Sequence, residues 1–165
     1  MTIKKATTRV MGVDPGLGIT GYGLVESNAH QLQLVEAGVI RTNSRSPMEQ
    51  RLVNIFTEMT TILSEFSPQF MVVEDLYAHY AQHRTAIIMG HARGVILLSA
   101  ARQGIPVTSY SATRIKKSIT GNGHATKEQV QQMVKRRLTL ASLPKPPDVA
   151  DALAAAICHL ENIQR

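Results

Sequence analysis

The sequence predicts an α/β domain in which a mixed five-stranded sheet carries helices on both faces. Apolar runs of strand length come in the order βββαβαβ and are followed by further helices. The first three strands are joined by connections too short for a crossover, which indicates antiparallel pairing. A helix precedes the fourth strand, so this strand is expected to run parallel to the first. We expect one domain, 1–165, with residues 1–8 as a flexible tail.

Each strand is predicted from a short apolar run bounded by turn-forming residues. The first run ends at Asp14, and the Pro-Gly that follows forms a turn because proline fixes one φ and glycine permits positive φ. The polar segment 27–30 separates the second strand from the third, and a helix precedes each of the other two. The strands are expected over 9–14, 20–26, 33–42, 70–74 and 106–110.

Helices are predicted where apolar residues recur at helical spacing or where capping residues occur. Two capping boxes, at 46–49 and 126–129, mark helix starts. The stretch 86–103 is apolar almost all round, which predicts burial on more than one side, either between layers or in a subunit interface. The helices are expected over 47–66, 86–103, 113–119, 127–138 and 148–162.

The composition favours an anionic partner. Eighteen lysines and arginines against twelve acids give a net charge of +6 and an isoelectric point near 9.8, although many proteins with basic surfaces bind no nucleic acid. Cys158 is the only cysteine, so we expect a small core residue and a reducing, cytoplasmic location. The longest apolar run is too short to span a membrane, and residues 1–9 lack the apolar core of a secretory signal.

Four of the twelve acids stand where a metal site would need them. Asp14 and Glu74 each end an apolar strand, and Asp148 and Asp151 lie one turn apart at the start of the last helix. If the first and fourth strands are neighbours, the last helix can bring its pair opposite the two strand ends. Carboxylates suit Mg²⁺, and two such ions about 3.5–4 Å apart can activate water at a phosphodiester. The pattern favours a protein that cuts nucleic acid.

Taken alone, most of these acids have a simpler explanation. Asp14 before Pro-Gly can be a turn former, Glu74 can belong to an ordinary strand exit, and Asp148 can be a helix N-cap. Asp151 lies a full turn inside the helix, where capping does not explain it. The residues leave these alternatives open, and the joint occurrence of the four acids favours the metal site.

Basic residues gather in the segment 114–137, at a density that suits contact with phosphates. They are Arg114, Lys116, Lys117, Lys127, Lys135, Arg136 and Arg137.

Several short motifs occur in order between about positions 9 and 160. They are Gly12-Val-Asp-Pro-Gly16, Thr20-Gly-Tyr-Gly23, Val73-Glu-Asp-Leu76, Gly90-His-Ala-Arg-Gly-Val95, Arg114-Ile-Lys-Lys117, Gly121-Asn-Gly123, Lys127-x-Gln-Val-Gln131 and Pro147-Asp-Val-Ala-Asp-Ala-Leu-Ala154. Through this ordered set the chain resembles the RuvC family of Holliday-junction resolvases. Two departures are His91, where the family usually has glutamine, and one extra residue between Glu74 and Gly90.

The resemblance implies an RNase H-like fold and a magnesium-dependent endodeoxyribonuclease. Such an enzyme resolves four-way DNA junctions by paired symmetric nicks, in recombination and in the repair of DNA damage. The implied catalytic and metal-binding residues are Asp14, Glu74, Asp148 and Asp151, with two Mg²⁺ ions in each active site and Mn²⁺ as a possible substitute.

The resemblance also implies the residues and partners for junction binding. The family's junction-binding lysines map onto Lys116 and Lys127, and Arg114 and Lys117 of the same segment complete the expected DNA-binding set. Tyr77 is the expected aromatic that stacks on an unpaired base, with Tyr80 as its rival because of the extra residue. The implied partners are a second copy of the chain, contacting through the helix from 86, and the branch-migration proteins RuvA and RuvB. No membrane partner is expected.

Two other functions stay open at this level. One is a different RNase H-like nuclease that acts on RNA–DNA hybrids or on ends. The other is a catalytically silent junction-binding module, although the presence of all four acids argues against it.

Overall fold

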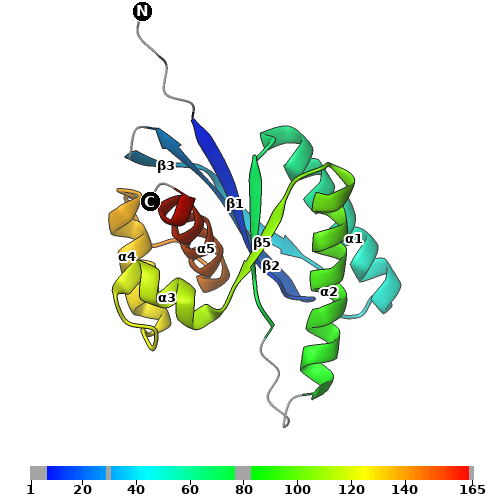
Figure 1. Ribbon diagram of the computed structural model, residues 1–165. Coiled ribbons are helices and arrows are strands. Elements are labelled where there is room, and N and C mark those ends of the chain that lie inside the picture. The colour runs from blue at the N-terminus through cyan, green and yellow to red at the C-terminus, as the bar shows by residue number, and fades with distance from the viewer. Residues whose placement is uncertain (1–6, 29–30, 77–82, 164–165) are drawn as a thin grey trace, which may run out of the picture.

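The computed structural model describes residues 7–28, 31–76 and 83–163, and these form a sheet with helices on both faces (Figure 1). The sheet has the strand order β3-β2-β1-β4-β5. Its strands are β1 (Thr8–Asp14), β2 (Ile19–Asn28), β3 (Gln31–Arg41), β4 (Phe70–Glu74) and β5 (Val107–Tyr110). The pairs β1–β2 and β2–β3 are antiparallel, whereas β1–β4 and β4–β5 are parallel. The predicted mixed sheet is confirmed, and its first and fourth strands are neighbours, which is the condition on which the expected metal site depended.

The helices form two layers. The helices α1 (Met48–Phe66) and α2 (His83–Arg102) cover one face of the sheet, and α5 (Pro147–Ile163) covers the other. The helices α3 (Ala112–Thr120) and α4 (Lys127–Arg137) pack against α5. Cys158 lies fully buried in α5, as predicted. Among the described residues, no helix is both long enough and apolar enough to span a membrane.

Strand alternation decides which face each acid occupies. Val10 and Val72 enter the core beneath α5, whereas Met11 enters the core beneath α1 and α2. Side chains two positions apart in a strand point to the same face. Asp14 is four positions after Val10, and Glu74 is two positions after Val72, so both acids belong to the face covered by α5.

The helix α5 lies directly on β1 and β2 because glycines leave room for its backbone. A Cβ on Gly12 would lie 1.8 Å from the carbonyl oxygen of Ala152, and one on Gly21 would lie 2.2 Å from that of Asp148. A Cβ on Gly23 would lie 2.4 Å from a methyl carbon of the α5 side chain Leu153. This close approach, which was not predicted, carries the acids of α5 down to the ends of the strands.

One of the two predicted capping boxes is present. In α4, the Thr126 hydroxyl accepts a hydrogen bond from the Gln129 amide at 3.2 Å, and the Gln129 side chain accepts one from the Thr126 amide at 2.9 Å. The box expected at 46–49 is wrong, because Pro47 is the N-cap of α1 and no side chain caps that end. Ser46 therefore lies one position too early to act as the cap.

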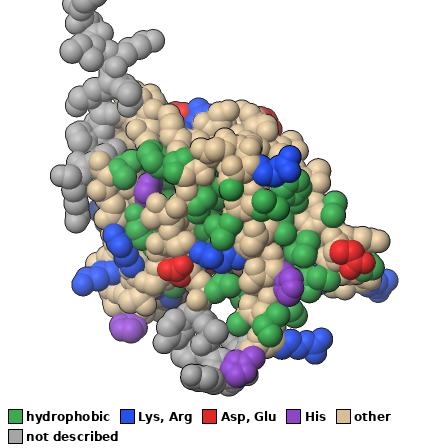
Figure 2. Space-filling view, turned by 45° about the vertical axis from the view of Figure 1, so that its right-hand side comes forward, with side chains coloured by type: hydrophobic (Ala, Val, Ile, Leu, Met, Phe, Trp, Pro, Cys, Tyr) green, Lys and Arg blue, Asp and Glu red, His purple; other side chains and the backbone are tan. Residues whose placement is uncertain are grey.

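The helix α2 buries one face, not several. Ala92 and Ile96 are fully buried, whereas the side chains of Ile87 and Leu98 are 63% and 52% exposed. Of the two alternatives, packing between layers is wrong, because the buried hydrophobic residues of α2 all enter the one core that it shares with α1. Figure 2, which turns this side of the molecule forward, shows hydrophobic side chains spread among basic ones. The place of α2 in a subunit interface stays a prediction.

The first strand begins inside the segment expected to be a tail. Strand β1 starts at Thr8, and the Gln69 side chain donates a hydrogen bond to the carbonyl of Thr7 at 3.3 Å. Residues 1–6 lie outside the described part of the chain.

Candidate metal-binding active site

Four carboxylates gather at one end of the sheet, beneath the first turns of α5. Asp14 and Glu74 are the last residues of the adjacent parallel strands β1 and β4. Asp14 pairs across β1–β2 with Gly21, the residue against which the backbone of Asp148 rests. One helical turn further along α5, Asp151 acts on both Asp14 and Glu74 by charge repulsion. The predicted convergence of strand ends and helix start is therefore what the fold produces.

Burial and mutual repulsion make Asp14, Glu74 and Asp151 hard to ionise. Burial raises the pKa of Asp14 from 3.8 to about 8, with further increases from the charges of Glu74, Asp151 and Asp148. Burial and the charge of Asp151 raise the pKa of Glu74. The pKa of Asp151 is raised by burial and then by Asp148. A shift in one direction at three neighbouring acids indicates that burial and mutual repulsion outweigh the positive charge near the site.

Two lysines of the basic segment stand at this site. The ammonium nitrogen of Lys127 lies 3.9 Å from Oδ2 of Asp151, although the lysine side chain is 64% exposed. Its charge lowers the pKa values of Asp14, Glu74 and Asp151, in opposition to burial. Lys116 has the same effect on Glu74 and Asp151. Both lysines therefore lie within electrostatic reach of the acids.

The other two expected DNA-binding cations lie elsewhere. The guanidinium of Arg114 stacks over the ring of Tyr110 at 4.4 Å. Arg114 and Lys117 both line a cavity of about 310 Å³, together with Cys158 and Glu161 from the C-terminal half of α5. Consecutive helix positions point in directions about 100° apart. The structure therefore divides the four cations into two groups. Tyr77 and Tyr80 lie outside the described residues.

Asp148 does not act as a helix cap. The helix α5 begins at Pro147, so Asp148 lies inside its first turn. Within the described residues its carboxylate accepts no hydrogen bond from a helix amide. The capping alternative considered from the sequence is thus not supported, and the side chain is available to the acidic cluster.

The donor set fits a hard divalent cation. Oxygen ligands from carboxylates are those that Mg²⁺ and Mn²⁺ prefer, and repulsion among the acids is relieved by positive charge. Among residues 7–28, 31–76 and 83–163, however, no three His, Cys, Asp or Glu side chains are already closed around a common point as a metal cage. The acids therefore supply the chemistry for an ion without a preformed coordination shell.

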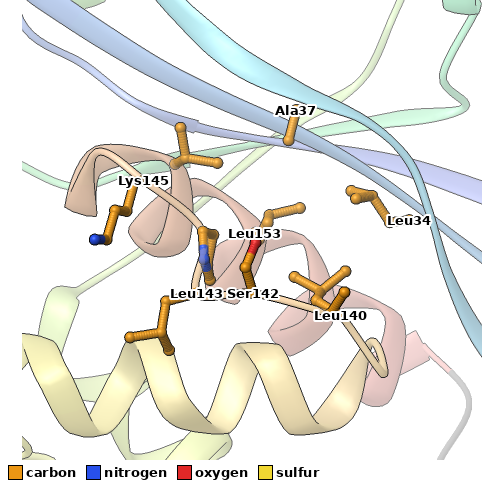
Figure 3. Close-up of a pocket in the computed structure, with 10 residues that line it drawn as sticks. Leu34, Ala37, Leu140, Ser142, Leu143, Lys145 and Leu153 are labelled. Carbon is orange, nitrogen blue, oxygen red and sulfur yellow. The ribbon is translucent and has the colours of Figure 1, made fainter.

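A larger groove lies away from the acids. It has a volume of about 680 Å³ and lies between the edge strand β3 and the segment that joins α4 to α5 (Figure 3). Its lining is largely apolar, with Leu34, Leu140 and Leu153 among its residues and Lys145 at its rim. None of the four acids lines it, so we assign the chemistry to the acidic cluster.

Comparisons with known proteins cover nearly the whole chain. The family model for crossover junction endodeoxyribonuclease RuvC matches residues 10–159. The protein of that name from Rhodopirellula baltica is 46% identical over 149 residues, which cover 90% of this chain and 84% of that protein. The one from Pelotomaculum thermopropionicum is 46% identical over 153 residues, which cover 93% of each.

Solved structures share the fold. T. thermophilus RuvC, solved in complex with Holliday junction substrate, matches with a TM-score of 0.89 at 33% identity and covers 95% of both chains. The yeast mitochondrial Holliday junction resolvase Ydc2 matches with a TM-score of 0.65 at 13% identity, over 95% of this chain and 79% of that one. The expected RNase H-like fold is confirmed.

Proposed function

Because the chain belongs to the RuvC family of crossover junction endodeoxyribonucleases, we propose that Asp14, Glu74, Asp148 and Asp151 form its active site. The protein is a magnesium-dependent Holliday junction resolvase, acting in recombination and repair. The hybrid nuclease and the silent binding module, which the sequence left open, are thereby set aside. The proposal concerns which residues cut the junction and how they do so.

The observation that carries the proposal is the gathering of the four carboxylates at the ends of β1 and β4 beneath α5, and the raised pKa of Asp14 supports it. Burial and three neighbouring carboxylates bring that pKa to about 8, so a full complement of ionised acids requires added positive charge. A divalent ion would be held by Asp14, Glu74 and Asp151, with Asp148 beside them. When bound, such ions activate a water molecule and stabilise the leaving oxygen of a phosphodiester. The proposal includes two ions, Mg²⁺ or Mn²⁺, because four carboxylates carry more charge than one divalent ion neutralises.

The four cations have two different tasks in this proposal. Lys116 and Lys127 hold the phosphate that is cut, and their electrostatic contact with the acids supports this assignment. Arg114 and Lys117, which line the cavity beside the C-terminal half of α5, contact the backbone of a junction arm. Alanine at each position should weaken junction binding and flatten its salt dependence, since each lost phosphate contact removes about one released counterion from the slope. If an alanine variant has the same salt dependence of junction binding as the wild type, the replaced residue does not contact a phosphate.

The finer assignments of assembly belong to the same proposal. We expect a homodimer, because paired symmetric nicks need two active sites at a fixed distance. The exposed side chains of Ile87 and Leu98 on α2 support this helix as the contact. Sedimentation at micromolar concentration measures the state directly, and a monomer there would contradict it. RuvA and RuvB as partners, the single domain 1–165 and a cytoplasmic location stay predictions.

One gel assay tests the proposed site. A synthetic four-way junction, an RNA–DNA hybrid and a plain duplex are each incubated with the wild type, with and without Mg²⁺, and with Asp14→Asn. The expected result is paired cleavage of the four-way junction and of neither other substrate. Only the wild type in the presence of Mg²⁺ should cut it. Junction cleavage by Asp14→Asn at the wild-type rate would remove Asp14 from the active site, whatever the family.

A further inference from the structure

Arg93 on α2 connects two strands immediately beside Glu74. Its Nη2 donates a hydrogen bond to the hydroxyl of Ser109 on β5 at 2.7 Å and a second to Oδ1 of Asp75 at 3.4 Å. Asp75 directly follows Glu74, and Ser109 pairs across β4–β5 with Val73, the residue before Glu74. One guanidinium therefore holds groups that flank Glu74 on both sides.

The two consecutive acids Glu74 and Asp75 serve opposite faces of the sheet. Glu74 belongs to the α5 face, and alternation turns Asp75 towards α2. The Asp75 amide donates to the carbonyl of Tyr110 at 3.0 Å, which extends the pairing of β4 with β5 one residue beyond Glu74. The ion pair of Arg93 with Asp75, whose side chain is 51% exposed, is therefore attached to the backbone that carries the Glu74 carboxylate.

The surroundings of Arg93 indicate a task beyond surface charge. Its side chain is 22% exposed, and its Nε is buried without a hydrogen-bond partner among the described residues. Burying a guanidinium with an unsatisfied N–H is unfavourable, so packing alone does not account for arginine here. One turn earlier in α2, a Cβ on Gly90 would lie 3.9 Å from Cδ1 of Leu76. The helix thus lies beside both residues that follow Glu74.

We propose that Arg93 is a positioning residue that fixes the exit of β4, and so sets the direction in which Glu74 presents its carboxylate to the catalytic cation. This inference rests on the proposed role of Glu74 at the active site. Arg93 itself does not reach the cation, because its side chain is on the opposite face of the sheet. Groups that orient a metal ligand through hydrogen bonds change metal affinity without changing the ligand set.

The test compares single variants of the full-length protein. Arg93→Ala removes the guanidinium, and Ser109→Ala removes one hydroxyl that it holds. Arg102→Ala is the matched control, since Arg102 is exposed on the same helix and its side chain makes no hydrogen bond or ion pair within the described chain. Glu74→Gln is the reference for loss of a ligand. Three quantities are measured: the Mg²⁺ concentration for half-maximal junction cleavage, the rise in melting temperature on adding Mg²⁺, and metal-free junction binding.

Arg93→Ala should require about tenfold more Mg²⁺ for half-maximal cleavage and for the rise in melting temperature. Its metal-free junction binding and metal-free melting should match those of Arg102→Ala. Ser109→Ala should shift the Mg²⁺ requirement in the same direction by less. The proposal is overturned if Arg93→Ala has the Mg²⁺ dependence of Arg102→Ala, or if it merely melts lower without metal.

If Arg93→Ala does not fold, the Mg²⁺ requirements of Ser109→Ala and Asp75→Asn test the positioning role instead. An unchanged Mg²⁺ requirement in both would reject the positioning role. The result for Glu74→Gln distinguishes a failure of the proposed active site from a failure of the proposed role of Arg93. If that variant keeps the wild-type Mg²⁺ response, the proposed active site fails, and the role of Arg93 fails with it. If it loses the response while Arg93→Ala keeps it, only the role of Arg93 fails.

Discussion

The ammonium nitrogen of Lys127 lies 3.9 Å from Oδ2 of Asp151, and this contact joins the basic segment of the chain to its acidic cluster. The lysine begins α4, and the aspartate lies one turn inside α5. In the absence of a metal ion, the lysine charge is one of two that lower the pKa of Asp151. The protonation of the acids therefore depends on Lys127, a residue that also binds DNA in our proposal.

Lys127→Ala should raise the pH at which Asp14 titrates above its value of about 8, because a charge that favours the ionised form is lost. Carboxylate carbon chemical shifts, followed by NMR against pH in the metal-free protein, measure this directly. Lys117→Ala is the control, since Lys117 does not act on the pKa of Asp14. Equal titration curves for both variants would place Lys127 outside the electrostatic field of the site.

The amide variants Asp14→Asn, Glu74→Gln, Asp148→Asn and Asp151→Asn should lose cleavage by more than about 100-fold, beyond the loss typical of residues that only orient a metal ligand. Metal-free junction binding should be kept, because the basic surface holds the DNA. Single-turnover cleavage and gel-shift measurements separate the two effects. The exposed acid Glu49 on α1 provides the control Glu49→Gln, which should cut normally. If a variant cuts at the control rate, the acid that it replaces is not a metal ligand.

The metal-free protein should lose stability as the pH rises from about 4 to about 8. The pKa of Asp14 is raised by folding from 3.8 to about 8, so its contribution to stability is present below pH 3.8 and is lost as the pH passes through the folded value. Asp14→Asn cannot ionise and should exceed the wild type by more than about 1 kcal/mol near pH 9. Urea unfolding with a chelator present measures this difference.

Added Mg²⁺ should reverse that pH dependence in the wild type, since an ion that binds only the folded state stabilises it. Equal metal-free stability of Asp14→Asn and the wild type at high pH would contradict the burial of an ionisable Asp14.

Gly12→Ala should destabilise the protein by about 1–3 kcal/mol or more, the range for overpacked cores. The new Cβ would lie 1.8 Å from the Ala152 carbonyl oxygen, so α5 would have to move away from β1. Cleavage should fall with it, because Asp148 and Asp151 move with the helix. Gly18→Ala is the control, since its Cβ would meet only the end of the Arg51 side chain at 3.9 Å. Equal melting temperatures for the two variants would rule out the close approach.

Tyr77→Ala should reduce junction cleavage strongly, whereas Tyr80→Ala should be nearly neutral. A stacked base contributes about 1–3 kcal/mol, and Tyr77→Phe should be tolerated because the ring, not the hydroxyl, stacks. Cleavage rates of the three variants measure this. Both tyrosines lie outside the described residues, so the assignment depends on the resemblance alone. The reverse pattern would assign stacking to Tyr80, and equal small effects would exclude both.

The sequence by itself determined the strands, the direction of their pairing and the acids that end two of them. Apolar runs that end at Asp14 and Glu74 identify strands and their terminal carboxylates, because burial and alternation act over a few neighbouring residues. Connection lengths then decide between parallel and antiparallel pairing. The capping box at Thr126 was equally readable, since its two hydrogen bonds are local. The box expected at 46–49 failed because the helix started one residue later than the local pattern indicated.

Only the tertiary structure decided which distant residues meet. Lys116 reaches the acids and its neighbour Lys117 does not, because the rotation of α3 against α5 selects one helix face. The close contact at Gly12 and the bond from Arg93 to Ser109 join elements that no sequence spacing relates. Packing of helices onto a sheet depends on the shapes of both surfaces at once. Such contacts cannot be derived from either segment alone.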